Sequence, residues 1–381
     1  MRTRVFDIQL PPAFRAACCL AFFMAMAFHV LANGPRQEFT KSINREFATN
    51  ANGMTALYNK YGSVNVKTWQ NNSVKIDITI RVNASNQRDA DKMFDRIQVN
   101  FANTTGYVKA ETMIESKSGW WVEDNVCRDY KINYEVWMPV GNQLDLKNKY
   151  GNSYVANLNG KLSAEIKYGD LRTEILTGDA EINMSYGKVF MAGVNNLYGQ
   201  VGYGEINLTA AKGEVQVDSK YSELRLEKAA AVRITSRYDD FTLGDIQDLR
   251  VQTKYSDLKA QRVGATFITA QYTDVKLMVV STSADVDLMY GGLKIESLGR
   301  DFTDANVVGK YTDVRITTER SARSKFKVDG SYTDISWPSG TTIRHQEKNA
   351  GYETVEGHVG SDANSKNMVK AKMQHGSFVL K

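Results

Sequence analysis

Cysteine and proline are scarce in this chain of 381 residues, which has three cysteines and five prolines. Two of the cysteines lie in an apolar stretch at the N-terminus, which leaves Cys127 without a partner for an internal disulfide. Stability must therefore come from a packed core and from backbone hydrogen bonds. Beyond the N-terminal stretch the prolines are Pro35, Pro139 and Pro338. Residues 140–337 contain none, as a long series of hydrogen-bonded strands requires.

Histidine is also rare, and no familiar catalytic arrangement is present. Beyond the N-terminal stretch the histidines are His345, His358 and His375. We find no Ser/His/Asp order, no zinc-ligand spacing and no phosphate-binding loop. The net charge of +5 is not gathered into a basic segment, which argues against nucleic-acid binding. These absences predict a chain without a catalytic centre, metal or cofactor.

The N-terminus has the pattern of a secretory signal peptide. A basic start, MRTRVF, is followed by an apolar run, Ala16–Ala32, that is short for a membrane span. The run ends in Val30-Leu31-Ala32, a small-residue pattern typical of cleavage sites. We predict a signal peptide over residues 1–32 and no transmembrane span in the mature chain. The alternative is a retained N-terminal anchor.

A tyrosine recurs at nearly constant spacing through the rest of the chain. It is commonly followed by a small residue, an acid and an apolar residue, as in KYSDLKA at residues 254–260. The gaps between successive tyrosines are 17, 18 or 21 residues, and such a period is typical of a solenoid. The tyrosines are Tyr150, Tyr168, Tyr186, Tyr203, Tyr221, Tyr238, Tyr255, Tyr272, Tyr290, Tyr311 and Tyr332.

Within each unit apolar residues alternate as in a strand, and the alternation resumes with shifted parity after a two-residue corner. A meander of antiparallel hairpins would need positive φ in that corner, which Thr273, Thr312 and Thr333 resist. The pattern favours an all-β, single-stranded parallel β-helix (a β-solenoid) with about 17–18 residues per rung. Equivalent side chains then stack about 4.8 Å apart. We expect the tyrosines to form an inward structural ladder, so that Tyr255→Ala costs about 3–5 kcal/mol.

The chain before the regular repeats is less uniform. We predict an N-terminal β region over residues 33–140. It contains one short helix, for which Ser85 is the expected N-cap, and this helix is expected to cover the end of the solenoid. The apolar face of the helix is Ala90, Met93, Phe94 and Ile97.

The regular solenoid repeats are predicted to span residues 141–338. Residues 339–366 show no strand alternation and are predicted to be a polar loop. The segment 339–381 then closes with VKAKMQHGSFVLK, which repeats the unit with His375 in place of tyrosine. We interpret it as the terminal rung.

Several landmarks of the chain resemble a known bacterial family. With NKYGSVNV, INYEVWMPVGNQLDLKNKYGN and the KYGD-like repeats, the chain is similar to the exported "putative adhesin" β-strand-repeat proteins, a family of unknown function related to the head domains of autotransporter adhesins. The resemblance implies a right-handed β-helix in the periplasm or on the cell surface of a Gram-negative-type bacterium. The later units depart from the pattern by carrying Ser, Thr or Asp in place of Gly.

The acids two places after tyrosine form the main candidate for chemistry. Stacked carboxylates could bind calcium or serve as the acid cluster of a polysaccharide lyase or hydrolase. Basic residues just before the tyrosines favour instead a solvated ladder of alternating charge. Candidate binding residues are Trp120, Trp121, Asp313 and Asp334. The acids are Asp170, Glu205, Glu223, Asp240, Asp257, Asp274, Asp313 and Asp334.

Two classes of function remain open at this point. The first is a non-enzymatic adhesin, binding protein or scaffold of the cell envelope, whose partner is a glycan or a protein of the envelope or host surface. The second is a glycan-active β-helix enzyme, which would interrupt its rungs with long loops around a cleft. Rungs from Tyr150 to Tyr290 vary by one residue, and this regularity favours the first class.

Overall fold

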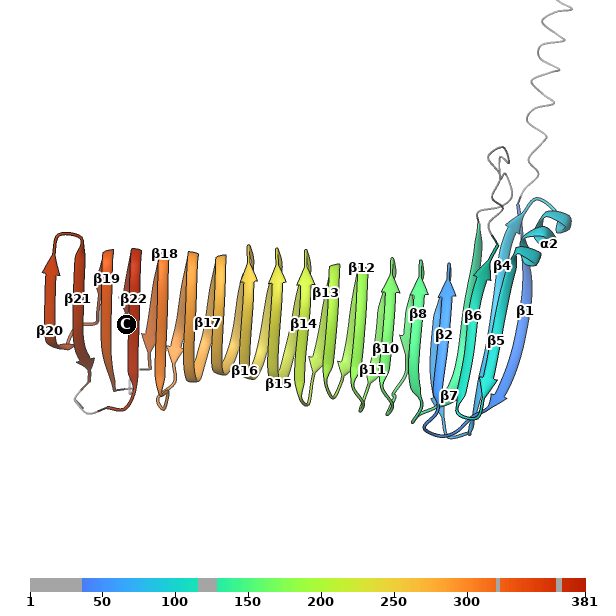
Figure 1. The fold of residues 1–381 in the computed structure, drawn as a ribbon, viewed down its shortest axis with the longest axis horizontal. Coiled ribbons are helices and arrows are strands. Elements are labelled where there is room, and N and C mark those ends of the chain that lie inside the picture. The colour runs from blue at the N-terminus through green and yellow to red at the C-terminus, as the bar shows by residue number, and fades with distance from the viewer. Residues whose placement is uncertain (1–35, 116–128, 320–322, 361–364) are drawn as a thin grey trace, which may run out of the picture. The chain divides into compact units, whose positions relative to one another are not determined.

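A computed structural model describes residues 36–115, 129–319, 323–360 and 365–381. The described chain is almost entirely β-strand, with one helix, α2 (Gln87–Arg96), which confirms the predicted all-β class (Figure 1). In these ranges no helix has the length and apolar character needed to cross a membrane. The predicted signal peptide, Trp120 and Trp121 lie outside the described residues.

The strands fall into an irregular N-terminal set and a repetitive set. The N-terminal strands are β1 (Gln37–Ala48), β2 (Met54–Lys60), β3 (Val64–Trp69), β4 (Ser73–Ala84), β5 (Ile97–Thr104), β6 (Tyr107–Ile114) and β7 (Tyr130–Pro139). The repetitive strands are β8 (Gln143–Lys149), β9 (Ser153–Val155), β10 (Leu162–Lys167), β11 (Leu171–Ile175), β12 (Ala180–Gly193), β13 (Leu197–Ala210), β14 (Glu214–Lys220), β15 (Glu223–Arg237), β16 (Asp240–Lys254), β17 (Asp257–Leu298), β18 (Asp304–Thr318), β19 (Ser324–Ser336), β20 (Thr342–Asn349), β21 (Tyr352–Val359) and β22 (Met368–Leu380).

The chain forms two compact units. The helix belongs to the smaller one and begins after Asn86, whose side-chain oxygen accepts a hydrogen bond from the Asp89 N–H at 3.0 Å. The N-cap is therefore one residue later than the predicted Ser85. The buried face of the helix is Ala90, Met93 and Phe94. Its role as a cap of the solenoid stays a prediction. Among the described residues the smaller unit comprises 36–42, 79–98, 113–115 and 129–131, and the larger comprises 43–78, 99–112, 132–319, 323–360 and 365–381.

In the larger unit the strands of the repeats pair in parallel with their copies in the neighbouring rung. The register of β15 with β16 runs from Glu223 opposite Asp240 to Arg237 opposite Lys254, a constant offset of one repeat. The same offset continues from β16 to β17, and successive strands lie side by side in Figure 1. These parallel registers confirm the β-solenoid.

Alternate side chains of each rung fill a continuous apolar interior. Val232 and Ile234 before the corner and Phe241 and Leu243 after it are almost completely buried. Each buried side chain of this kind contributes about 1.5–3 kcal/mol. The residues between them point outward and are mostly charged or polar. The shift in parity predicted at the corner is thus present, and it has a specific backbone cause.

That cause is the tyrosine itself, which adopts a left-handed conformation. In the described chain, every non-glycine residue with positive φ is a repeat tyrosine, Tyr61 or His375, with φ between 50° and 62°. Such a residue turns the chain so that its side chain points outward. From Tyr61 to Tyr311 the side chains are 39–52% exposed. The predicted inward orientation is therefore wrong, because strand parity does not continue through a left-handed residue.

The residue after each tyrosine points inward and packs against the rung before it. A Cβ at Gly169 would lie 2.1 Å from the carbonyl oxygen of Gly151, so the early rungs admit only glycine here. Most of the later rungs place a hydroxyl at this position, and the exceptions are Asp239, Gly291 and Gly376. The Thr273 hydroxyl accepts from the N–H of Ser256 at 3.3 Å, and the Ser256 hydroxyl accepts from the N–H of Asp239 at 3.2 Å. A polar inward column thus replaces the glycines of the early rungs.

The C-terminal segment forms a rung, but not the terminal one. β22 pairs in parallel with β18 on one side and with β19 on the other. The last rung along the stack is therefore that of β19, although β19 precedes β22 in sequence. The prediction from sequence order was wrong because the chain leaves one position in the stack open between β18 and β19, and β22 later fills it.

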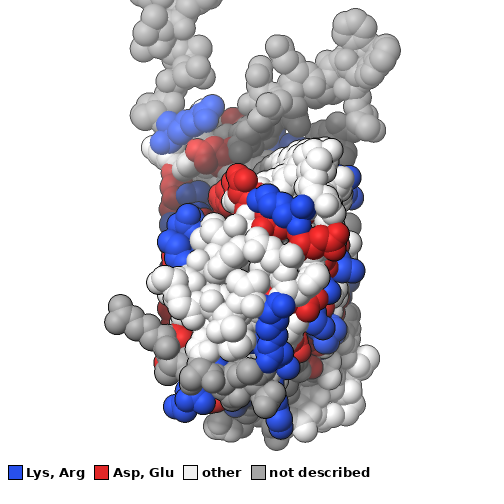
Figure 2. Space-filling view, turned by 90° about the vertical axis from the view of Figure 1, so that its left-hand side faces the viewer, with Lys and Arg blue, Asp and Glu red and all other residues white. Residues whose placement is uncertain are grey.

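The predicted polar loop is also wrong, since residues 342–359 form a hairpin. β21 pairs antiparallel with β19 and with β20, which is the outermost strand of this end. Side chains on both faces of β20 are exposed, so no apolar alternation was needed in its sequence. Seen from this end, uncharged residues occupy the middle of the surface and charged residues its margins (Figure 2). A bulge and charged side chains on an edge strand discourage further pairing.

We predict that Tyr255→Ala lowers the free energy of unfolding by about 1–3 kcal/mol, because two ring contacts worth about 0.5–1.5 kcal/mol each are lost. This is less than the 3–5 kcal/mol expected for a buried ring. Tyr255→Gly should be no worse than Tyr255→Ala, since glycine tolerates positive φ. Tyr255→Phe should stay within about 0.5 kcal/mol. Urea denaturation of the variants checks this, and a Phe variant as damaged as the Ala variant would contradict it.

Asp239 generates a second prediction, because it is the one acid of the inward column. Its carboxylate accepts from the Ser222 N–H and the Ser219 hydroxyl, both at 2.6 Å, but burial is the larger effect and raises its pKa. A raised pKa in the folded state means that stability is lost as pH rises through that pKa. Asp239→Ser keeps an acceptor for the Ser222 N–H. It should raise the free energy of unfolding near neutral pH by on the order of 1 kcal/mol.

The advantage of Asp239→Ser should shrink as the pH is lowered through the raised pKa of Asp239, because the buried parent carboxyl then takes up its proton and no longer carries a charge. Denaturation of both proteins across this pH range measures the difference. Asp240→Ser, at the neighbouring outward position, is the matched control and should show a much smaller change. A parent protein that is more stable than Asp239→Ser at neutral pH would overturn the prediction.

Candidate binding face

Aromatic rings form one continuous column along the corner that carries the left-handed residues. Neighbouring rings are nearly parallel from Tyr61 to Tyr311, with centroids 4.8–5.1 Å apart. His375 extends the column, with its ring 4.8 Å from that of Tyr311 and 5.2 Å from that of Tyr332. This is the tyrosine column: Tyr61, Tyr150, Tyr168, Tyr186, Tyr203, Tyr221, Tyr238, Tyr255, Tyr272, Tyr290, Tyr311, His375 and Tyr332.

Stacking limits what the tyrosine column offers a ligand. Each inner ring has a neighbouring ring against both faces, which leaves those faces unavailable to a sugar or another planar group. Solvent reaches the ring edges. Basic side chains just before the tyrosines also lie close to the rings, as Lys220 does, with its Nζ 5.1 Å from the Tyr221 centroid. The column is therefore a structural ladder with a polar rim.

A second column lies two residues after each tyrosine. This acidic column consists of Asp170, Lys188, Glu205, Glu223, Asp240, Asp257, Asp274, Gly292, Asp313, Ser377 and Asp334. It is mostly acidic, as expected, but it has three exceptions, which are Lys188, Gly292 and Ser377. The electrostatics therefore differ between parts of the acidic column.

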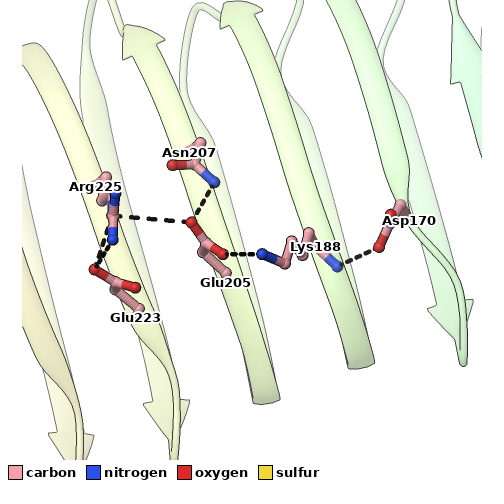
Figure 3. Close-up of polar contacts among 6 residues, drawn as sticks. All are labelled: Asp170, Lys188, Glu205, Asn207, Glu223 and Arg225. Carbon is pink, nitrogen blue, oxygen red and sulfur yellow. Dashed lines mark hydrogen bonds and ion pairs between the residues drawn. The ribbon is translucent and has the colours of Figure 1, made fainter.

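In the N-terminal part the charges are neutralised by direct contacts (Figure 3). Lys188 lies between two acids: its Nζ is 2.8 Å from the Glu205 carboxylate, and its backbone N–H donates to Asp170 at 2.9 Å. Arg225 pairs with Glu223 at 2.7 Å. The hydrogen bond from Lys188 is the main reason that the pKa of Glu205 is lowered. This part resembles the solvated ladder of alternating charge that the sequence predicted.

In the C-terminal part three aspartates follow one another without a cation between them. Asp240 lies opposite Asp257 in the register, and Asp274 follows one rung later. Among the described residues no ion pair within 4 Å reaches Asp240 or Asp257, whereas Asp274 accepts the Gly292 N–H at 2.8 Å. The aspartates and the tyrosines of their rungs line a shallow groove of about 490 Å³.

A third column, four residues after the tyrosines, is basic over four successive rungs. It consists of Lys259, Lys276, Lys294 and Arg315. Lys294 bonds to Glu296 at 2.5 Å, and Lys276 lies 3.9 Å from the same carboxylate. Cations and acids therefore run side by side along the outer face of these rungs.

Gly292 opens a groove between the acidic and basic columns. It stands opposite Asp313 in the register and carries no side chain, so a depression of about 380 Å³ remains. We call this the Gly292 groove. It is lined by the carboxylates of Asp257, Asp274 and Asp313, by the four cations of the basic column, and by Ser377 and Val379. The Asp313 carboxylate is oriented by the Ser377 hydroxyl, which donates to it at 2.7 Å.

The structure separates the two aspartates that the sequence singled out. Asp313 lines the Gly292 groove, but Asp334 does not, because Ser377 of the inserted strand stands between them in the register. His375 stacks within the tyrosine column, while His345 and His358 lie on β20 and β21. His358 is buried. The candidates Trp120 and Trp121 are outside the described residues.

Sequence reasoning missed the basic column and the role of Gly292. A signal for both was present: a cation recurs four places after Tyr255, Tyr272, Tyr290 and Tyr311, and glycine replaces the acid only in the unit of Tyr290 among these four. The basic residues that the sequence prediction used are those just before the tyrosines, not those four places after them. In the described residues, no group of three or more His, Cys, Asp or Glu side chains is arranged to hold a metal ion.

No known family profile matches this sequence, and no curated protein matches it. Among the solved structures to which the chain is similar are three that each cover 90% of its length. One is a putative cell adhesion protein from Clostridium sporogenes (11% identity, 99% of that chain covered, TM-score 0.18). The others are putative adhesins from Parabacteroides distasonis (8%, 97%, 0.27) and Bacteroides fragilis (13%, 97%, 0.21). At these identities and TM-scores the similarity assigns no function.

The run of three aspartates gives a third prediction. Asp257→Ala should leave the free energy of unfolding unchanged or raise it by up to about 0.5 kcal/mol, because it removes the middle of three like charges. Added salt should reduce the difference in the free energy of unfolding between Asp257→Ala and the parent, because salt screens the repulsion between the aspartates. Glu205→Ala is the matched control and should destabilise by up to about 1 kcal/mol, since its neighbours are cations. Urea denaturation at low and high salt compares them. A large loss for Asp257→Ala would mean that the carboxylate holds an unrecognised ligand.

Proposed function

We propose that this chain is an exported, non-enzymatic binding protein of the cell envelope, and that it holds an extended acidic glycan along the Gly292 groove. Export rests on the signal-peptide pattern of residues 1–32. The single observation that carries the binding proposal is the groove itself, where acidic and basic columns lie side by side around a missing side chain.

The donor and acceptor set of the groove suits a ligand with both hydroxyl and carboxylate or sulfate groups. The Asp274 and Asp313 carboxylates accept hydrogen bonds from hydroxyl groups, and the cations Lys276, Lys294 and Arg315 donate to anionic groups. Each charge-assisted contact of this kind is worth about 1.5–3 kcal/mol when it is made. A polymer with a repeating hydroxyl and acid pattern would meet the same columns in several successive rungs.

The shape of the groove favours binding over catalysis. Its lining residues all lie on strands β17, β18 and β22, and it has no wall made of a long loop. A catalytic site usually excludes water around the reacting bond. The shallow outer face of a sheet does not do so, and it suits a chain that lies along the surface.

The fourth prediction tests this function with matched charge changes. We expect the mature protein to bind polysaccharides that contain uronic acid or sulfate, and to bind neutral polysaccharides more weakly. Lys276→Ser with Arg315→Ser should weaken binding at least about tenfold, because two charge-assisted contacts are lost. A glycan array followed by titration calorimetry measures both effects.

The control is Arg250→Ser with Arg262→Ser, which removes the same charge from other exposed sites, where the two arginines pair with Asp248 and Asp245. This variant should bind within about twofold of the parent. An equal loss of affinity in both double variants would mean that net charge alone determines binding, and it would contradict a site in the Gly292 groove. Cleavage of any of the polysaccharides, abolished by Asp313→Ala, would instead support the enzyme class.

A further inference from the structure

The two strands on either side of β22 do not pair with each other in the described chain. β18 pairs with β22 from Asp304 opposite Met368 to Ile316 opposite Leu380. β19 pairs with the other edge of β22 from Lys325 opposite Met368 to Ser336 opposite Val379. Without β22 these two rungs would face each other across a space one strand wide. We call this space the C-terminal slot.

The C-terminal slot is complementary to β22 in shape as well as in backbone pairing. Val369, Ala371 and Phe378 are buried in the core of the rung. Met373 lies against Gly309, where a Cβ would come within 2.7 Å of its sulfur. A larger residue at position 309 would therefore displace it.

The corner of β22 is equally specific. Gly376 has φ 127°, and a Cβ there would lie 2.2 Å from the carbonyl oxygen of Thr312. The His375 ring completes the tyrosine column between Tyr311 and Tyr332. Beyond the strand, the backbone N–H of Lys381 donates to the Ile316 carbonyl at 2.9 Å. The slot thus recognises a strand with alternating apolar residues and a glycine after the corner ring.

We propose that the C-terminal slot also accepts the β22 segment of a second copy of this chain, so that two molecules join by reciprocal strand exchange. Every contact of β22 with β18 and β19 can be made by an identical strand from another molecule. The two forms therefore differ mainly in the entropy of linking the strand. A strand on its own chain acts at an effective concentration of about millimolar, which favours the single chain when the protein is dilute.

Chain order makes this exchange accessible. β18, β19 and the β20–β21 hairpin all precede β22 in sequence, so the walls of the slot are made before the strand that fills it. During folding at high protein concentration a neighbouring chain can supply the strand first. The proposal concerns the end of the solenoid and does not depend on glycan binding.

A disulfide across the slot distinguishes the two forms. Val308 and Lys372 lie directly opposite each other on β18 and β22, and both side chains are exposed. In a Cys127→Ser background, Val308→Cys with Lys372→Cys forms a disulfide within one chain if β22 fills the slot of its own molecule. The same bond joins two chains if the strand is exchanged. The mature chain is refolded over a range of concentrations, oxidised and separated under denaturing, non-reducing conditions.

We expect a covalent dimer whose share rises several-fold with the protein concentration during refolding. The matched control is Arg233→Cys with Arg250→Cys, which face each other on β15 and β16 and can only bond within a chain. It should stay monomeric. Circular dichroism checks that each variant folds. A slot variant that folds and remains monomeric at every concentration overturns the proposal, as does an equal dimer share in the control.

A competing peptide gives a second readout. A synthetic peptide of residues 366–381, added in excess during refolding, should occupy the slot and reduce the covalent dimer several-fold. The same peptide with Gly376→Val should have no effect, because the side chain would collide with the Thr312 carbonyl. Equal effects of the two peptides would mean that the dimer does not form through the slot, and would overturn the proposal.

Discussion

The parallel pairing of each rung with the next is the constraint on which the rest of this structure depends. It places equivalent residues opposite each other, as Glu223, Asp240 and Asp257 are, at a spacing of about 4.8 Å. A residue type chosen for one rung therefore meets its own kind in the neighbouring rungs. Aliphatic residues gain from this in the interior. On the outside, charged and aromatic side chains need an arrangement in which the stacking of identical side chains in successive rungs is not destabilising.

The tyrosine column is one such geometry. A left-handed residue at a sharp corner would ordinarily be glycine, since other residues pay about 1–2 kcal/mol for that conformation. Here the same conformation turns each ring outward onto its neighbours, and ring stacking offsets the backbone strain. His375 has the same conformation and role in the inserted rung, because its imidazole ring also stacks on a neighbouring ring. Stacking occupies the ring faces, so the proposed binding is assigned to the charged columns beside them.

The charged columns handle repetition in two ways. Around Glu205, Lys188 lies within the acidic column and Arg225 lies beside it, and both form ion pairs with Glu205. Around Asp257 the acids are stacked without that relief, and the cations stand in a column of their own. The second arrangement is less favourable for stability by itself. Its carboxylates and cations, however, can form hydrogen bonds with a ligand on the outer face. This difference is why the candidate site lies in the C-terminal part of the solenoid, next to Gly292.

Most of the architecture could be predicted from the sequence because it depends on local and periodic features. The period of the tyrosines, the alternation of apolar residues and the absence of proline determine an all-β solenoid of about 17–18 residues per rung. Tertiary structure alone decided the orientation of the tyrosines, since strand parity carries no information about a left-handed residue. It also decided that β22 lies between β18 and β19 and that Ser377 separates Asp313 from Asp334. A repeat sequence contains the same pairing pattern in every unit, so it specifies that rungs stack but not which rung lies next to which.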